Sequence, residues 1–418
     1  MRRAALLALL LVSAPPAATA APMTFEQAAA RLAAEAPALK AADAGQRAAE
    51  ASLRDADRRP NPTAELEVEN FAGTGPYRGF DGTEVTALIE QPIELGGKRR
   101  ARVAVAQAEI ALAVAERQSE QRRLLAELVR TYGTAAASRA RVGVAAEQVE
   151  VAETLASQSA RRLAVGDIAE VEHDRVLVTL GEARAELERA QREAESAERG
   201  LALLVGASEP VQADPSFMTT QGTDPARITI VTADEARFRA IAARDRARIV
   251  AARAERVPDL AARGGVRVAR EEEAVALVAG VSIPLPLFNP GRARVAQAQA
   301  EADRASFAAE AERREARRTA ERALGNWRSA LSLLETIERQ TIPAAERLVT
   351  LTERGYRLGA LPYRDLADVR TSLYSARRAR LDALEQVAAA RADLAEVTGV
   401  YGELGLPTPT IASETAAK

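Results

Sequence analysis

This chain has few side chains of the types that bind transition metals most strongly. It has one histidine, His173, three methionines and no cysteine. Transition-metal sites gather several such ligands at one point, so we expect no resident metal and no cofactor. No nucleophile, base and orienting residue can be assembled around a pocket from the sequence, and we therefore expect no enzyme activity.

Composition and motif spacing exclude two further classes of ligand. Gly96-Gly97-Lys98 lacks the earlier glycine and the following Ser or Thr of a phosphate-binding loop, so we expect no nucleotide site. The 57 Lys and Arg residues are balanced by 59 Asp and Glu residues, which leaves a net charge of −2. That balance gives no reason to expect nucleic acid as a partner.

Three acidic residues remain as candidates because of where they stand. Asp365 and Asp368 lie six and nine residues after Gly359, and Glu172 lies six residues after Gly166. Acidic side chains early in a helix are favoured by the helix dipole, which is the simplest interpretation of these positions. Any further role depends on the elements that position them.

Those elements come in two copies. Residues 100–109 and 292–301 are identical at nine of ten positions, and the proline and glycine landmarks around them follow the same order. A shared order of helix breakers is harder to produce by chance than similarity between Ala-, Arg- and Glu-rich helices, so the sequence predicts a duplicated unit. We place the first repeat at 21–215, the second at 216–400, and a C-terminal tail at 401–418.

Each repeat begins with a helix and continues with a β-hairpin. Capping-box spacings start the helices, at Thr24 with Gln27 and at Thr232 with Glu235, and Pro37 predicts a break in the first helix. The hairpins are predicted at about 63–93 and about 260–284. In the first, carboxylates alternate strictly with apolar residues, which is typical of a strand with two different faces. Those residues are Ala64, Glu65, Leu66, Glu67, Val68 and Glu69.

A long helical hairpin follows each β-hairpin, at 97–205 and at 290–398. The helix after Gly97 runs for roughly 100 Å if it is continuous, far more than a compact core needs. Pro343 predicts a kink in the corresponding helix of the second repeat. A narrow coiled-coil seam is predicted along the first long helix. Its residues are Val103, Ile110, Val114, Leu124 and Leu128. Four residues are predicted at the bends from strand to helix: Gly96, Gly97, Pro290 and Gly291.

The N-terminus has the pattern of a secretory signal at 1–20. Arg2 and Arg3 precede the apolar run Ala4–Val12, and Ala18-Thr19-Ala20 is a cleavage site of small residues. A membrane anchor is the alternative, but the run is much shorter than the ~20 residues that span a bilayer. The rest of the chain has no apolar run of that length either, so entry into a membrane would require strands, and strands from several copies together.

Signal, duplication, paired β-hairpins and very long helical hairpins together resemble the TolC-type outer-membrane efflux proteins. The resemblance covers essentially the whole chain after the signal. The segment 91–99, Gln-Pro-Ile-Glu-Leu-Gly-Gly-Lys-Arg, is most similar to the CzcC-like branch that serves heavy-metal cation efflux. The implied fold is mainly α with a small β part. In it, a homotrimer of duplicated protomers forms a twelve-stranded β-barrel joined to a long α-helical barrel.

The resemblance also implies roles for particular residues. The turns between the helical limbs become periplasmic tips where an adaptor protein docks. These adaptor-docking residues are Arg162, Leu163, Val165, Gly166, Asp167, Arg357, Leu358, Gly359 and Ala360. Asp365, Asp368 and Glu172 become a pore constriction that favours cations, and Arg364 beside Asp365 departs from the family pattern.

The implied function is a passive exit duct in the outer membrane, with its helical barrel in the periplasm. Its implied partners are two further copies of the chain, a periplasmic adaptor, an inner-membrane pump of the RND type and outer-membrane lipid. Multidrug efflux or type I secretion through the same fold is the alternative cargo class. The alternative protein class is a periplasmic coiled-coil adaptor or structural protein, which two β-hairpins and the lack of a lipoyl-like domain disfavour.

Overall fold

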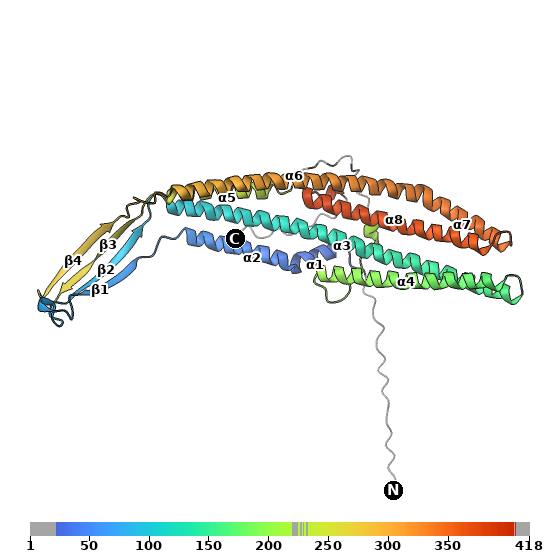
Figure 1. The fold of residues 1–418 in the computed structure, drawn as a ribbon, viewed down its shortest axis with the longest axis horizontal. Helices are drawn as coiled ribbons and strands as arrows, with labels where there is room; N and C mark the ends of the chain where they lie inside the picture. Colours follow the sequence, from blue (N-terminus) through green and yellow to red (C-terminus); the bar gives the residue numbers. More distant parts are fainter. Residues whose placement is uncertain are drawn as a thin grey trace, which may run out of the picture.

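The chain forms an elongated molecule with a sheet at one end and two helical hairpins running to the other (Figure 1). A computed structural model describes residues 22–219, 225, 228, 230, 233–404 and 406. The predicted signal at 1–20 and residues 407–418 of the predicted tail lie outside the described residues.

The elements of the two repeats follow one another in the same order. The first repeat contains α1 (Phe25–Glu35), α2 (Pro37–Ala56), β1 (Thr63–Glu69), η1 (Gly75–Tyr77), β2 (Glu84–Ile93), α3 (Lys98–Ala164) and α4 (Glu170–Leu204), followed by η2 (Pro215–Thr219). The second contains α5 (Glu235–Ala254), β3 (Leu260–Ala269), β4 (Ala274–Ser282), α6 (Arg292–Thr336), η4 (Ile337–Thr341), α7 (Ile342–Arg357), α8 (Tyr363–Thr398) and η5 (Gly402–Leu404).

The first of the two predicted capping boxes is confirmed. Gln27 N donates to Thr24 Oγ1 at 3.3 Å, and Thr24 N donates to Gln27 Oε1 at 3.0 Å, so both halves of the first box are present. In the second repeat, α5 begins at Glu235 with Asp234 as its N-cap, and Thr232 lies outside the described residues. The Asp234 carboxylate is engaged elsewhere, because Ser119 and Arg122 of α3 both donate to it.

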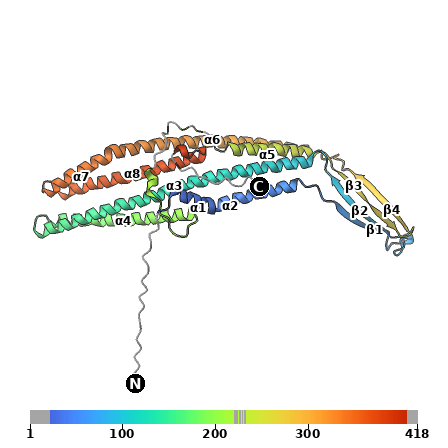
Figure 2. The ribbon, with the colours of Figure 1, turned by 180° about the vertical axis from the view of Figure 1, so that it is seen from behind.

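The four strands form one antiparallel sheet in the order β1-β2-β3-β4. The two hairpins therefore lie side by side, with β2 and β3 in the middle and one strand of each repeat at each edge. Figure 2 shows the sheet extending beyond the ends of the helices, at an angle to them, at one end of the molecule.

The long helix α3 does not follow the single seam that the sequence predicts. Leu124 and Leu128 are buried, but Val103, Ile110 and Val114 are only half-buried. Before Leu124, the buried apolar positions of this helix are Leu112 and three alanines, Ala101, Ala106 and Ala115. This helix packs against α1, α2, α4, α5 and α8. Because it has neighbours on several sides, small residues around its circumference admit them more closely than one apolar stripe would.

The matching helix of the second repeat is interrupted. Five residues, Ile337–Thr341, adopt a π-helical turn between α6 and α7, directly before Pro343. Proline cannot donate its backbone nitrogen to the preceding turn, and the wider turn is one way for a helix to accommodate that loss. The sequence predicts a kink at Pro343, and the structure has a π-helical turn just before it.

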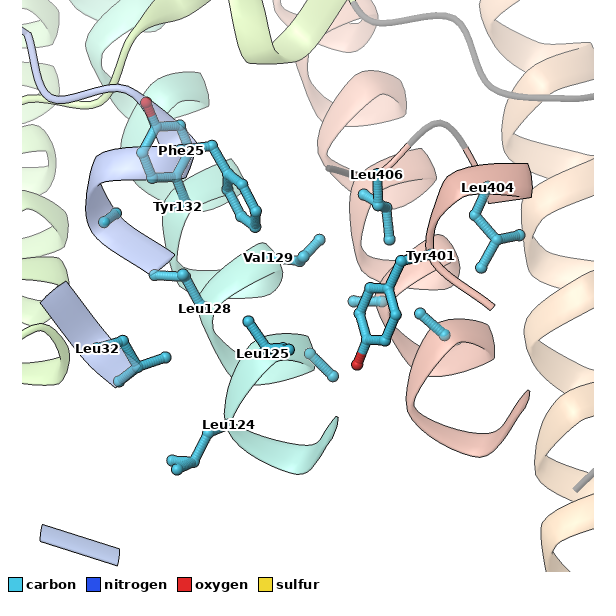
Figure 3. Packing of buried hydrophobic residues seen from close by; sticks show 14 of the residues in the cluster. Phe25, Leu32, Leu124, Leu125, Leu128, Val129, Tyr132, Tyr401, Leu404 and Leu406 are labelled. Carbon is cyan, nitrogen blue, oxygen red and sulfur yellow. The ribbon is translucent and has the colours of Figure 1, made fainter. Parts of the chain in front are cut away.

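The main apolar core lies near the middle of the molecule, where both repeats meet. Figure 3 shows Phe25 of α1 beside Tyr132 of α3, with Tyr401 and Leu404 on the opposite side. The rings of Phe25 and Tyr132 are 5.5 Å apart at 78°, an edge-to-face contact. Trp327 of α6 is 1% exposed in the same core, as expected for a packing residue. The start of the predicted tail also belongs to this core.

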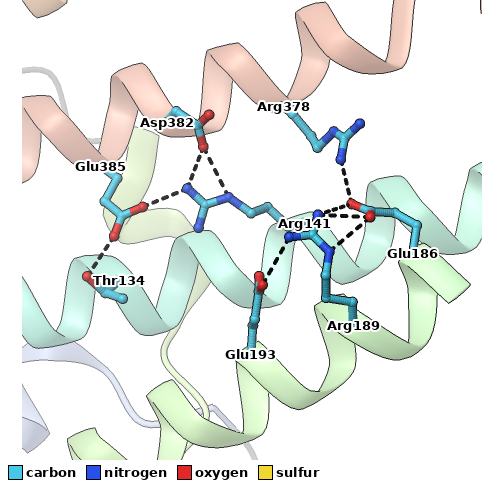
Figure 4. Close-up of polar contacts among 8 residues, drawn as sticks. All are labelled: Thr134, Arg141, Glu186, Arg189, Glu193, Arg378, Asp382 and Glu385. Carbon is cyan, nitrogen blue, oxygen red and sulfur yellow. Dashed lines mark hydrogen bonds and ion pairs between the residues drawn. The ribbon is translucent and has the colours of Figure 1, made fainter. Parts of the chain in front are cut away.

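Ion pairs join the helices on the tip side of the core. Figure 4 shows Arg141 of α3 between Asp382 and Glu385 of α8, at 2.6 Å from each, while Arg378 of α8 binds Glu186 of α4. These contacts cross between the two hairpins and fix how α8 lies against α3 and α4. Within the described part of the chain, no helix is both long enough and apolar enough to cross a membrane.

Candidate functional site

The first tip, residues 162–167, is a tight turn that reverses the chain between α3 and α4. Gly166 has a φ of 75°, a left-handed conformation that glycine adopts without strain. Gly166 N donates to Leu163 O and Asp167 N to Arg162 O, both at 2.9 Å, which closes α3 with a Schellman motif. Arg162 Nε also donates to Asp167 Oδ2 at 2.6 Å, so one ion pair spans the turn.

The second tip, residues 357–361, repeats this geometry between α7 and α8. Gly359 has a φ of 71°, and Gly359 N and Ala360 N donate to Tyr356 O and Gly355 O at 3.0 and 2.9 Å. Leu358 at this tip and Val165 at the first tip are 78% and 79% exposed. Each tip therefore presents at least one large apolar side chain to solvent on a hydrogen-bonded turn.

The three candidate acids lie in the first turns that follow the tips. Glu172 is the third residue of α4 and Asp365 the third residue of α8, with Asp368 one turn further along. Arg364 Nε lies 3.4 Å from Asp365 Oδ1 on an exposed surface, so the family departure at Arg364 does pair with the acid. Glu172 and Asp368 form no ion pair within the described part of the chain, and Asp368 is exposed.

A small apolar cluster beneath the tips holds the two hairpins together. Its buried members come from four helices: Leu155, Val176, Tyr356, Tyr363 and Leu366. The Tyr356 and Tyr363 rings are 6.0 Å apart, and the Arg162 guanidinium lies 5.2 Å from the centre of the Tyr356 ring. Arg162 of the first hairpin thus touches a residue of the second through a cation–π contact.

The cluster opens into a cleft of about 390 Å³ between α3 and the second hairpin, lined by Leu155, Tyr356, Leu366 and an Arg370–Glu353 ion pair. Sequence reasoning missed Tyr356, Tyr363 and Arg370. The signal available was that two tyrosines flank the Gly359 turn in a chain with only six. Burial raises the pKa of Tyr363 above its ordinary value, despite a hydrogen bond with Thr179.

The sheet at the other end of the molecule has two chemically distinct faces. Residues directly paired across an antiparallel sheet lie on the same face. One face, here called the polar face, carries five carboxylates and two guanidinium groups: Glu65, Glu67, Glu69, Glu84, Glu90, Arg263 and Arg267. The other, the apolar face, carries Leu66, Val68, Ile89, Val266, Val268, Val275, Leu277 and Val281. All eight of these apolar side chains are exposed in the single chain.

Glycines set the bends where strands give way to long helices. Gly97 and Gly291 are the N-caps of α3 and α6, with φ of 75° and 72°. Gly96 has a φ of 68°, and a β-carbon there would lie 2.6 Å from Val257 Cβ. At the second bend, Arg256 Nε donates to Pro290 O at 3.2 Å. All four predicted bend residues lie at these two junctions.

Lys98 fixes the first bend to the second repeat. Its side chain is 7% exposed, and Nζ lies 2.8 Å from Asp259 Oδ2 and 3.9 Å from Glu255 Oε2. Burial alone would raise the pKa of Asp259, but the hydrogen bonds from Lys98 and Leu95 N, together with the charges of Lys98 and Arg102, leave that pKa below its ordinary value. The Gly-Gly-Lys segment is therefore a structural junction between repeats.

Metal ligands do not cluster among the described residues. His173 Nδ1 lies 2.8 Å from Ser159 Oγ, a buried hydroxyl of the facing helix, so its described contact is with a packing partner.

Comparison with known proteins connects these features to one family. The outer membrane efflux protein family matches residues 28–207 and 234–400, the greater part of both repeats. The cobalt-zinc-cadmium resistance protein CzcC of Cupriavidus metallidurans is 28% identical over 395 residues, 92% of each chain. The nickel and cobalt resistance protein CnrC of the same organism is 32% identical over 299 residues, 64% of this chain and 66% of that one.

A solved structure shows the same fold. The outer-membrane channel OprN superposes with a TM-score of 0.72 at 22% identity, over 90% of this chain and 89% of that chain. The resemblance read from segment 91–99 to a heavy-metal branch is confirmed by the relatives that match. With both repeats matched and the duplicated fold in common, this chain belongs to the outer membrane efflux protein family.

Proposed function

We propose that this chain is the outer-membrane exit channel of a tripartite efflux system and that its cargo is heavy-metal cations. The observation that carries the cargo class is the match to CzcC, a cobalt-zinc-cadmium resistance protein, along 92% of both chains. CnrC, a nickel and cobalt resistance protein, matches over a shorter span at higher identity. An inner-membrane pump of the RND type and a periplasmic adaptor would supply energy and cargo, and this chain would provide a passive duct.

The sheet supports a place in the outer membrane. Its apolar face exposes Val, Leu and Ile side chains from all four strands, and Leu277 alone is 88% exposed. Burying such a face in lipid recovers about 25 cal/mol for each Å² removed from water. The polar face then lines an aqueous interior, where its excess of carboxylates over guanidinium groups attracts cations.

The opposite end of the molecule supports the periplasmic roles. In a trimer, Asp365, Asp368 and Glu172 would each occur three times around the axis, and rings of carboxylates favour cations over anions. Val165 and Leu358 protrude from the two turns, where each offers apolar area that a docking protein would bury. We assign the two tips to adaptor docking and the three acids to the constriction.

Transport needs no bound cofactor in this proposal. Hydrated cations pass along the carboxylate-lined interior, and opening requires the contacts between the hairpins near the tips to loosen. The Arg162–Tyr356 contact and the Tyr356–Tyr363 pair belong to that set. Proteins that switch conformation commonly do so by moving a packed cluster from one arrangement to another.

The test is the growth of a deletion strain of the native host on graded zinc, cobalt, cadmium, nickel and copper salts beside organic antibiotics and dyes. We expect sensitivity to one or more metals, restored by the wild-type gene. Sensitivity to antibiotics and dyes alone would overturn the metal assignment and favour the multidrug alternative. Loss of secretion of a protein substrate, without either sensitivity, would favour type I secretion.

A further inference from the structure

The two edge strands of the sheet, β1 and β4, run in directions that allow β4 of one copy to pair antiparallel with β1 of another. Four successive antiparallel strands in the order β1-β2-β3-β4 leave β4 running opposite to β1. The outer edges of β1 and β4 pair with no other strand in the part of the chain that the structure describes. An edge of this kind presents unpaired backbone donors and acceptors, which must be satisfied where water is excluded.

The β1 edge carries a row of unneutralised carboxylates on the polar face. Glu65, Glu67 and Glu69 are all exposed, and none forms an ion pair within the described residues. Alternate residues of a strand lie about 7 Å apart on one face, so the three charges repel one another. By contrast, Glu84 on the adjacent strand is paired, with Arg267 Nη1 at 3.3 Å and Asn70 Nδ2 at 3.1 Å.

The β4 edge carries an arginine that points towards it. A β-carbon placed on Gly280 of β4 would lie 2.9 Å from Arg263 Nε, so the Arg263 side chain, which starts from β3, lies across β4. Gly280 leaves the room for this. Arg263 is exposed and has no carboxylate partner among the described residues, whereas Arg267 on the same strand and face is held by Glu84 and Thr86.

We infer that Arg263 forms an ion pair with the Glu65–Glu69 row of a second copy of this chain, whose β1 pairs with β4. Adjacent strands lie about 4.8 Å apart, so the second copy's β1 is about 10 Å from the β3 backbone. Arg263 Nε already lies over Gly280 of β4, and a glutamate side chain from the second copy covers the remaining gap. This inference rests on the proposed trimeric channel and adds the charge contact that selects the partner edge and its register.

The proposed ion pair between copies is directional, because its two partners lie at opposite edges of the sheet. The acidic row belongs to the first repeat and the arginine to the second, so each copy offers a donor at one edge and acceptors at the other. Such a head-to-tail contact closes into a ring when the rotation from one copy to the next is a whole fraction of a turn, as in the proposed trimer. Because like charges face each other at β1–β1 contacts, the same charges disfavour two copies meeting at their acidic edges.

The first experiment locates the contact with engineered cysteines, which have no background because the natural chain has none. Leu66→Cys on β1 is combined with Val275→Cys, Leu277→Cys or Ala279→Cys on β4, all on the apolar face and away from the charged residues. Full-length protein in detergent is oxidised by dioxygen with copper phenanthroline, which removes two thiol hydrogens for each disulfide formed. We expect dimers and trimers on denaturing gels from at least one combination. Monomer from all three would overturn both the edge-to-edge assembly and the ion pair.

The second experiment tests the ion pair itself against a matched control. Arg263→Gln should accelerate trimer dissociation by at least about tenfold, which corresponds to ~1.4 kcal/mol. Arg267→Gln, on the same strand and face, removes an arginine whose partner is in its own chain and should leave dissociation within about twofold. Arg263→Glu should be worse than Arg263→Gln and should be rescued by arginine at one of positions 65, 67 or 69.

The outcomes of these experiments distinguish the trimeric assembly from the ion pair. Cross-linked trimers together with equal dissociation rates for Arg263→Gln and Arg267→Gln would leave the trimer standing and overturn the ion pair. If the Arg263→Glu protein fails to assemble, the double variant with an arginine at position 65, 67 or 69 still tests the ion pair. Recovery of assembly in that variant is explained only by a contact between residue 263 and the β1 row. Recovery with none of the three arginine substitutions would count against the pairing.

Discussion

The two helical hairpins come from one duplicated sequence, yet they are built differently. In the first, α3 is continuous for 67 residues and is packed by α1, α2, α4, α5 and α8. In the second, the outgoing limb runs for 45 residues and is then interrupted by the π turn Ile337–Thr341. Beyond that turn, α7 buries only Thr352 and Tyr356. Duplication has therefore preserved the turns and lengths while one limb became a central support and the other a more exposed, interrupted arm.

The comparison is sharpest at three levels along the hairpins. At the core, both limbs are anchored by large buried side chains. At the bends, the first limb is held by a buried lysine and the second by contacts to Arg256. At the tips, the two turns are nearly identical. A substitution at each level should change the stability of one hairpin alone or of both hairpins equally.

The largest effect is expected at the core anchor of the second hairpin. Trp327→Ala removes a side chain that is 1% exposed and should lower the free energy of unfolding by about 3–5 kcal/mol. Thermal unfolding followed by helical circular dichroism measures it. Arg339→Ala, on an arginine side chain that is 78% exposed further along the same arm, is the control and should change stability by about 0.5 kcal/mol or less. Equal effects would show that this arm is not anchored at Trp327.

The next effect should be the same in both hairpins. Gly166→Ala and Gly359→Ala each force a β-carbon into a left-handed turn, at a cost of about 1–2 kcal/mol. Neither glycine has an atom within 4 Å that an added β-carbon would meet, so backbone strain alone sets the cost. Gly143→Ala within α3, with the same open space, should instead stabilise by about 0.5–1 kcal/mol. Clearly unequal losses at the two tips would break the equivalence between them.

A smaller effect belongs to the first bend alone and depends on pH. Lys98→Met removes the partner that depresses the pKa of Asp259, and should cost about 1 kcal/mol near neutral pH. A carboxyl whose folded pKa is below its unfolded value stabilises the fold above the unfolded pKa, and this stabilisation fades as the pH falls through the folded value. The wild type should therefore lose its advantage over Lys98→Met in the range below the ordinary aspartate pKa of 3.8. Parallel stability curves down to acidic pH would contradict this account of the bend.

The smallest effect concerns local opening rather than global stability. Amides at Ile337–Thr341 should exchange with solvent about tenfold faster than those of α3 near Gly143, since the π turn has weaker backbone hydrogen bonding. Pro343→Ala should narrow the difference, because it restores a backbone donor. Hydrogen exchange with mass spectrometry measures both. Equal protection from hydrogen exchange in the two limbs would contradict a difference in local stability between them.

Much of the fold follows from patterns in the sequence. Alternation in 64–69 predicts β1, the shared order of glycines and prolines predicts the repeats, and Pro37 marks the break between α1 and α2. The seam at Val103, Ile110 and Val114 is wrong because a single helix pattern does not reveal how many neighbours surround it. The second capping box stays a prediction, because Thr232 lies outside the described residues.

The candidate site divides in the same way. The glycine turns and the acids after them can be placed from the sequence, because both depend on local spacing. The cluster of Tyr356, Tyr363 and Val176 depends on two hairpins meeting, and no local pattern reports that contact. The same holds for Arg263, whose path over Gly280 follows from the register of β3 on β4.

The most direct test of the proposed cation channel is the reversal potential of purified full-length protein in a planar bilayer under a potassium chloride gradient. We predict a potential of the sign expected for cation selectivity, and a marked shift towards zero for Asp365→Asn combined with Asp368→Asn. Arg364→Gln should move it the other way, because Arg364 lies against Asp365. Anion selectivity in the wild type, or a selectivity that the double asparagine variant leaves unchanged, would contradict the assignment of these acids to the conducting path.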